Sequence, residues 1–367
     1  MQRIDREYRL MKKTITYLII LAVFILTALS GCGKKKTEIV LTTEFEEGEI
    51  FRIETSSCYD YEALVYMVNS ENGYSELFGD RIWQAELEDG STVQERYKDT
   101  ILARLAQIKV MNLMAQERKI SLDEETDNKV RTAARVYMDG LSEAEKEIMK
   151  IDEEKVYGMY REYAIADLLY HSITDEVNPE ISDDAARTIT VGSILVKTSA
   201  MDSNGKLVPY SDDEKLKAYE RALEIKKKID EGTEFDVLAD SYYNEDEESE
   251  YSFGRGVMPY ALESAAFNLA NGEISDIIET EYGYHIIKCR SSFNKEETEK
   301  NKLNIVKEKK QEAFNAAYKE YVTELKSNLN EPLWLSLSYT KTDEIKTTNF
   351  FDLYDSYFTV VEGGAIT

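Results

Sequence analysis

The chain has 367 residues, of which 43% are hydrophobic and 32% are charged. This length allows two or three domains, and the apolar share excludes a wholly disordered chain. The 71 acidic side chains outnumber the 45 basic ones, which gives a formal net charge of −26 at pH 7. Nucleic-acid binding requires concentrated positive potential, so we expect no nucleic-acid partner; the charge favours a soluble body whose copies repel one another.

The N-terminal segment differs in kind from the rest of the chain. A basic opening, which starts at Met1 or at Met11, precedes an almost wholly apolar run over residues 15–29. As a helix this run would be about 22 Å long, which is short of the ~30 Å hydrocarbon core of a bilayer. The pattern therefore predicts a signal peptide over residues 1–31.

Small residues and a single cysteine directly follow the apolar run, as Leu29-Ser30-Gly31-Cys32. They resemble the lipobox of bacterial lipoproteins, which implies cleavage before Cys32 and attachment of a diacylglycerol to its sulfur. Each buried methylene contributes about 0.8 kcal/mol, so several acyl chains would hold the protein at a membrane surface. The alternatives are an ordinary cleaved signal or an N-terminal anchor helix in which Cys32 is incidental.

The remaining chemistry-bearing residues are few. Cys58 and Cys289 stand far apart and make no disulfide framework, so we expect two buried free thiols rather than a bridge. The chain has only two histidines, and no cluster of metal-ligating residues is evident, so neither a metal nor a cofactor is expected. We interpret His171 as a surface residue.

Residues 91–174 are predicted to be mostly helical, because apolar side chains recur there at helical spacing. Residues 38–55 alternate loosely and predict one or two short strands. A helix is predicted from about Asp152 to His171. Capping boxes mark three earlier helix starts: Thr92 with Glu95, Ser121 with Glu124, and Ser142 with Glu145.

A second helical pattern follows Phe293, and the chain then ends in an aromatic-rich tail. One isolated helix is marginal in water, so its apolar stripe needs a partner. We therefore predict an N-terminal helical chaperone-like domain over residues 32–180, onto which residues 293–367 pack. The segment between them would be inserted into this domain.

The inserted segment mixes strands and helices. A β-rich run covers residues 188–197, and a helix capped by Ser211 and Glu214 stops at Gly232. A short helix, an acidic loop and another short helix follow. Two strands, over residues 274–280 and 284–289, meet at a tight turn through Gly283.

This order of elements resembles the parvulin fold, also called the PpiC or rotamase domain, over residues 187–292. Three stretches carry the resemblance: Lys226 to Ala239, Phe253 to Phe267, and Asn271 to Lys288 with its Glu-Tyr-Gly-Tyr-His run. It implies an α+β fold, with a small antiparallel sheet flanked by helices, and peptidyl-prolyl cis-trans isomerase activity without a cofactor.

The resemblance also implies site residues. Met258 and Leu262 match the methionine and phenylalanine that line the proline pocket of the family, with plain core packing as the alternative. His285 matches the second active-site histidine, which can equally be structural. Asp246 falls where the family places a cysteine or aspartate, within what can also be a solvated acidic loop. Ser193 stands where the family has its first histidine.

The chain combines a signal peptide, a lipobox, flanking helices and a parvulin-like domain. This combination resembles the extracytoplasmic foldases of the PrsA and SurA type. This implies an isomerase and chaperone, lipid-anchored to the outer face of the bacterial cell membrane, whose partners are unfolded or newly secreted polypeptides. The alternative is a holdase that has lost catalysis, as Ser193 suggests. A solute-binding lipoprotein is a third reading, although its repeated βαβ units are missing. The sequence leaves the oligomeric state open, a homodimer included.

Overall fold

The computed structural model describes residues 45–87, 89–202, 206–242, 250–339 and 342–358. The chain divides into two compact units. One contains the described residues up to 176 and those from 313 onward, and the other comprises residues 177–312. The boundary between residues 312 and 313 lies inside a long helix, α10 (Lys295–Val322). The domain boundaries that we inferred from the sequence stay a prediction.

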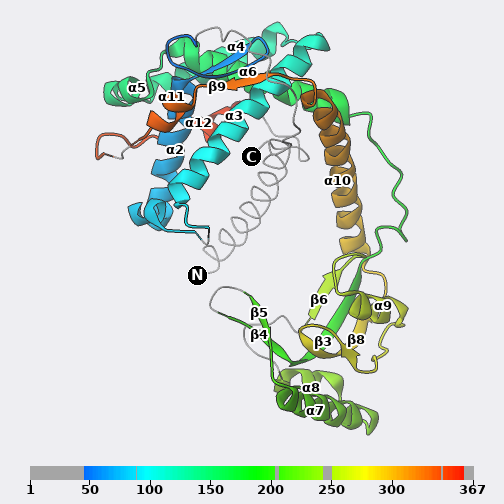
Figure 1. Ribbon diagram of the computed structural model, residues 1–367. Helices are drawn as coiled ribbons and strands as arrows, with labels where there is room; N and C mark the ends of the chain where they lie inside the picture. The colour runs from blue at the N-terminus through cyan, green and yellow to red at the C-terminus, as the bar shows by residue number, and fades with distance from the viewer. Residues whose placement is uncertain (1–44, 88, 203–205, 243–249, 340–341, 359–367) are drawn as a thin grey trace, which may run out of the picture. The chain divides into compact units, whose positions relative to one another are not determined.

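The first unit is mainly helical and carries a three-stranded sheet in the order β2-β1-β9 (Figure 1). Both neighbours of β1 run antiparallel to it. In chain order its elements are β1 (Glu49–Ile53), β2 (Ser56–Tyr59), α2 (Asp60–Phe78), the 3-10 helix η1 (Asp80–Gln84), α3 (Val93–Glu117), α4 (Glu124–Asp139), α5 (Glu143–Met149), α6 (Glu153–Thr174), β9 (Ser327–Leu329), α11 (Glu331–Ser336) and α12 (Phe350–Tyr357).

The core of this unit joins the helices to the end of the chain. Phe314 of α10 and the tail residues Trp334, Phe350 and Tyr354 are buried in the same hydrophobic cluster as α2, α3, α4 and α6. The ring of Phe350 lies 4.7 Å from that of Tyr160, centroid to centroid. The aromatic tail is therefore part of the core.

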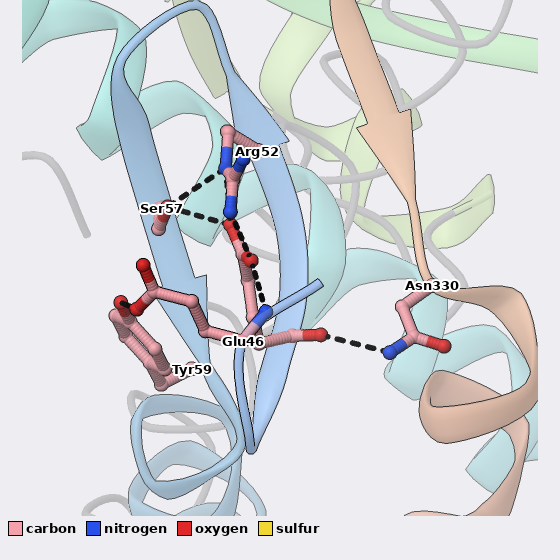
Figure 2. Close-up of polar contacts among 6 residues, drawn as sticks. Glu46, Arg52, Ser57, Tyr59 and Asn330 are labelled. Carbon is pink, nitrogen blue, oxygen red and sulfur yellow. Dashed lines mark hydrogen bonds and ion pairs between the residues drawn. The ribbon is translucent and has the colours of Figure 1, made fainter. Parts of the chain in front are cut away.

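Three buried charged groups of this unit, Lys109, Glu62 and Glu49, are paired. Nζ of Lys109 lies 2.8 Å from a carboxylate oxygen of Glu62 and 2.8 Å from one of Glu162. The carboxylate of Glu49 accepts hydrogen bonds from Arg52 and Ser57, and Asn330 donates to the Glu49 carbonyl at 3.1 Å. Figure 2 shows the polar contacts around this β1–β2 hairpin, to which the segment after β9 is tied.

The sequence patterns missed or misplaced two features of this unit and one feature of α10. Helix α2 has buried residues nearly all round, polar Asn69 and Asn72 among them, and such a helix shows no apolar stripe. The predicted capping box at Ser121 is wrong, because Asp123 caps α4 by accepting the backbone N–H of Thr126. On the part of α10 that belongs to the second unit, Leu303 is 71% exposed, so it does not contribute to the apolar stripe predicted for the helix after Phe293.

The second unit is built on a four-stranded sheet in the order β6-β3-β8-β7, in which every pair is antiparallel. Figure 1 shows β3 beside β8 within this unit. In chain order the elements before α10 are β3 (Ile189–Lys197), β4 (Ser199–Met201), β5 (Leu207–Pro209), α7 (Asp212–Asp230), α8 (Phe235–Tyr242), β6 (Glu250–Phe253), α9 (Tyr260–Asn268), β7 (Ile278–Glu279) and β8 (Gly283–Ser291).

Helices cover both faces of this sheet. Ile194 and Ile286 point to the face packed by α7 and α8, in a cluster with Ile225 and Phe235. Val191 and Ile287 point to the opposite face, in a cluster with Leu262 and other residues of α9. The fold class predicted from the sequence, α+β with an antiparallel parvulin-like sheet, is confirmed, although β6 was missed.

Candidate active site

His285 lies in the middle of the sheet, on the face that α9 covers. It stands on β8, opposite Leu195 of β3 and opposite Ile278 of β7. Successive strand residues point to opposite faces, so His285 shares its face with Ile287. The residue is only 6% exposed, and its Nε2 lies 2.8 Å from the hydroxyl of Thr280, which fixes the ring.

The turn before His285 requires glycine. Gly283 has φ of +152° and stands opposite Lys197 in the sheet register. A Cβ atom built at this position would lie 2.2 Å from the carbonyl oxygen of Val196. The Tyr-Gly-Tyr-His run noted in the sequence therefore has a steric cause: only glycine lets β8 start where it does.

Met258 and Leu262 lie on the same side of the sheet as His285. Leu262 is 2% exposed and belongs to a hydrophobic cluster that also contains Ile287 and Ile278. Ile287 lies two residues after His285 on β8, and Ile278 stands opposite His285 on β7. Met258 is half-buried and packs against this cluster. The structure thus brings three of the predicted site residues to one apolar face.

The other predicted site residues have different outcomes. Ser193 lies on β3 opposite Ile287, and so on the same face of the sheet as His285. Asp246 and Cys32 lie outside the described residues. The side chain of His171 on α6 is 40% exposed and lies 3.3 Å from Asp175, as expected of a surface residue.

Thr280 and Tyr251 were not singled out in the sequence. A hydroxyl residue just before a Gly-containing turn was the available signal for Thr280. Tyr251 gave none, because its place on this face of the sheet depends on the pairing of β6 with β3.

Within the described part of the chain, no group of three or more His, Cys, Asp or Glu residues is arranged to hold a metal ion. The thiols of Cys58 and Cys289 are both buried and free, as predicted. None of the described helices has the length and apolar character needed to cross a membrane.

The parvulin resemblance is confirmed by comparison with known proteins. A family model described as the PPIC-type PPIase domain of the rotamase family matches residues 194–291, which contain Met258, Leu262 and His285. Fold and match together define this segment as a peptidyl-prolyl cis-trans isomerase domain of the PpiC type.

Parts of the chain are similar to foldase proteins named PrsA. One from Geobacillus kaustophilus is 32% identical over 122 residues, which is 32% of this chain and 38% of that protein. One from a Geobacillus species is 26% identical over 259 residues, covering 67% of this chain and 83% of its own. A solved peptidylprolyl isomerase (PrsA) from Bacillus cereus is 19% identical, covers 73% of this chain and 97% of its own, and has a TM-score of 0.35.

Proposed function

We propose that this chain is an extracytoplasmic foldase that catalyses cis-trans isomerisation of X-Pro peptide bonds in exported polypeptides. The matched PpiC-type domain and the similarity to PrsA foldases support the class. The observation that carries the activity is the shared face of Met258, Leu262 and His285, because an isomerase of this type needs an apolar surface beside a fixed polar group.

The chemistry needs no nucleophile, metal or cofactor. Partial double-bond character gives the peptide bond a rotational barrier of ~18–20 kcal/mol. An apolar surface holds the proline ring and excludes water, and the twisted amide, having lost its resonance, is favoured where hydrogen bonds fit its altered shape. Half-buried Met258 would contact the ring, while Leu262 supports the surface from beneath and His285, held by Thr280, presents the polar edge.

A second function, favoured by Ser193, is a holdase that binds unfolded clients without isomerising them. Serine provides one hydroxyl at a position where the resemblance implies an imidazole. A protein of this kind would still need the apolar face, because unfolded chains expose apolar side chains.

A protease-coupled assay on short X-Pro peptides separates the two functions. A rate above the uncatalysed isomerisation supports the isomerase. No such rate, together with suppressed aggregation of a chemically denatured model protein, supports the holdase. If the folded chain neither accelerates isomerisation nor suppresses aggregation, both proposals are wrong.

We also propose that the mature protein is held at the outer face of the cell membrane through a lipid on Cys32, with unfolded exported polypeptides as partners. The lipobox-like run Leu29-Ser30-Gly31-Cys32 supports this anchor. Cys32→Ser should move the protein from the detergent phase to the aqueous phase of a detergent partition and leave the isomerisation rate unchanged. Equal partition of both forms would contradict lipid attachment.

A further inference from the structure

Met258 stands on a short loop, residues 254–259, between β6 and α9. A glycine turns the backbone of this loop: Gly256 has φ of +79°, and a Cβ atom built there would have no atom within 4 Å apart from its chain neighbours. The backbone conformation, and not a lack of space, therefore requires glycine. In this conformation the backbone N–H of Gly256 donates a hydrogen bond to Oε2 of Glu263 on α9, at 2.6 Å.

Glu263 holds the loop on both sides of Met258. Its side chain accepts the hydrogen bond from Gly256, which lies two residues before Met258. Its backbone N–H donates to the carbonyl oxygen of Pro259, directly after Met258, at 3.0 Å. A carboxylate acceptor makes the first of these bonds roughly twice as strong as a bond between neutral groups.

Side-chain packing gives this loop only two contacts with the folded domain. Val257 and Tyr260, on either side of Met258, are exposed. Met258 itself is half-buried against the apolar cluster of α9, and the guanidinium carbon of Arg255 lies 4.4 Å from the ring centroid of Phe267. The backbone that carries Met258 therefore depends on its hydrogen bonds to α9 for a fixed position.

We infer that Glu263 is a positioning residue of the isomerase site. By holding the backbone at Gly256 and Pro259, it sets the position in which Met258 meets the prolyl ring, and it acts on the substrate only through Met258. Successive residues of a helix lie about 100° apart, so Glu263 reaches the loop while Leu262 stays in the core. This inference rests on the proposed isomerase function.

Kinetics of two variants test it on the chain without its predicted signal peptide. Glu263→Ala removes the acceptor, whereas Glu263→Gln keeps an acceptor oxygen at the same reach without the charge. On an Ala-Ala-Pro-Phe peptide we expect kcat/KM to fall about tenfold in Glu263→Ala, the rate equivalent of one charge-assisted hydrogen bond, and at most about threefold in Glu263→Gln. KM should rise, because Met258 contacts the ring in the ground state too.

Glu273→Ala is the matched control. Oε2 of Glu273 accepts a hydrogen bond from the backbone N–H of Ala270 at 2.8 Å, so this variant removes the same kind of bond from the same unit. That bond closes the turn after α9, which does not carry Met258. The control should leave kcat and KM unchanged. Should Glu263→Ala fail to fold, Glu263→Leu decides, since leucine fills the space without an acceptor.

A double variant separates positioning from a general loss of stability. If Glu263 acts through Met258, adding Glu263→Ala to Met258→Ala should cost no further rate, because both substitutions remove the same contact with the substrate. The residual rate is measured at raised protein concentration. Additive losses, equal losses in Glu263→Ala and Glu263→Gln, or an unchanged kcat/KM in Glu263→Ala would each overturn the inference.

The proposed function and the inference can fail separately. Methyl NMR of carbon-labelled methionine reports the environment of Met258 without catalysis, and Met258→Leu assigns its signal. We expect Glu263→Ala to shift or broaden this signal and to leave that of exposed Met201 unchanged, whereas Glu273→Ala changes neither. If the wild-type chain shows no rate above background, the isomerase function fails. An altered Met258 signal in Glu263→Ala then keeps the positioning role, and an unaltered signal overturns it.

Discussion

The hydroxyl of Thr280 lies 2.8 Å from Nε2 of His285 and ties the β7–β8 turn to the candidate active site. The same hydroxyl accepts a hydrogen bond from the backbone N–H of Tyr282 at 3.2 Å. One side chain thus fixes the turn and orients the histidine. An imidazole this buried needs a partner for its polar edge, because an unpaired buried polar group costs about 1–3 kcal/mol.

Thr280→Val should therefore lower both the isomerase activity and the stability of the protein. Valine keeps the shape of threonine but removes the hydroxyl. We expect kcat/KM to fall about three- to tenfold and the free energy of unfolding to fall by about 1–3 kcal/mol. Stopped-flow isomerase assays and urea unfolding measure the two effects. Thr280→Ser keeps the hydroxyl and should lie close to wild type; a loss in Thr280→Ser with none in Thr280→Val would show that the methyl group, and not the hydrogen bond, matters.

Gly283→Ala should destabilise the isomerase domain more than a Gly→Ala change at a position that has positive φ but open space around the added Cβ. The new Cβ meets the Val196 carbonyl, and overpacking of this kind costs about 1–3 kcal/mol beyond the strain of positive φ. Gly272→Ala is the control, since Gly272 has φ of +82° and no atom within 4 Å of the added Cβ. Its cost should be about 1–2 kcal/mol. Equal unfolding free energies of the two variants would contradict this account of the turn.

Lys109→Met should destabilise the helical unit strongly. The substitution leaves Glu62, which is 2% exposed, without its counter-ion, and breaking a buried pair costs about 3–5 kcal/mol. Lys129→Met is the control, because the Lys129–Glu125 pair is exposed and such pairs contribute at most about 1 kcal/mol. Thermal and urea unfolding compare the two. A loss no larger than in the control would show that Lys109 and Glu62 do not form the pair described.

Glu71 should make stability depend on pH. Burial raises its pKa from 4.5 to about 7, and the hydrogen bond from Gln94 opposes this only in part. The folded state then binds a proton that the unfolded state releases, so the associated stability is complete below pH 4.5 and lost as pH rises through 7.

Replacing this carboxylate should remove that dependence. Glu71→Gln is expected to raise the free energy of unfolding at pH 8 by about 1–3 kcal/mol and to change it little at pH 4.5. Glu76→Gln, at an exposed position of the same helix, should follow the wild-type curve. Urea unfolding from pH 4.5 to 8 measures this, and an undiminished decline in Glu71→Gln would assign the pH dependence to another group.

The parts of the fold that were predictable are those with local causes. The capping boxes at Thr92 and Ser142 formed as predicted, because both partners lie within one helical turn. The turn at Gly283 was readable because a single backbone position demands glycine. By contrast, the sequence patterns did not predict α2, because this helix is buried on most sides and shows no apolar stripe. They did not predict β6 either, because an acidic run precedes it.

The candidate site was predictable only where the family motif is intact. His285, Met258 and Leu262 were found by resemblance, and their common face then followed from the strand register. The place of Tyr251 on this face was not predictable, because it depends on the pairing of β6 with β3.

The most direct test of the isomerase function is an NMR exchange measurement of cis-trans interconversion in an Ala-Ala-Pro-Phe peptide, with catalytic amounts of the chain without its predicted signal peptide. We predict faster exchange with wild type and with Met201→Ala, an exposed methionine of the same unit, but at least tenfold less acceleration with Met258→Ala. Exchange no faster with folded wild-type protein than without it, or equal acceleration by the two methionine variants, would contradict the proposed site.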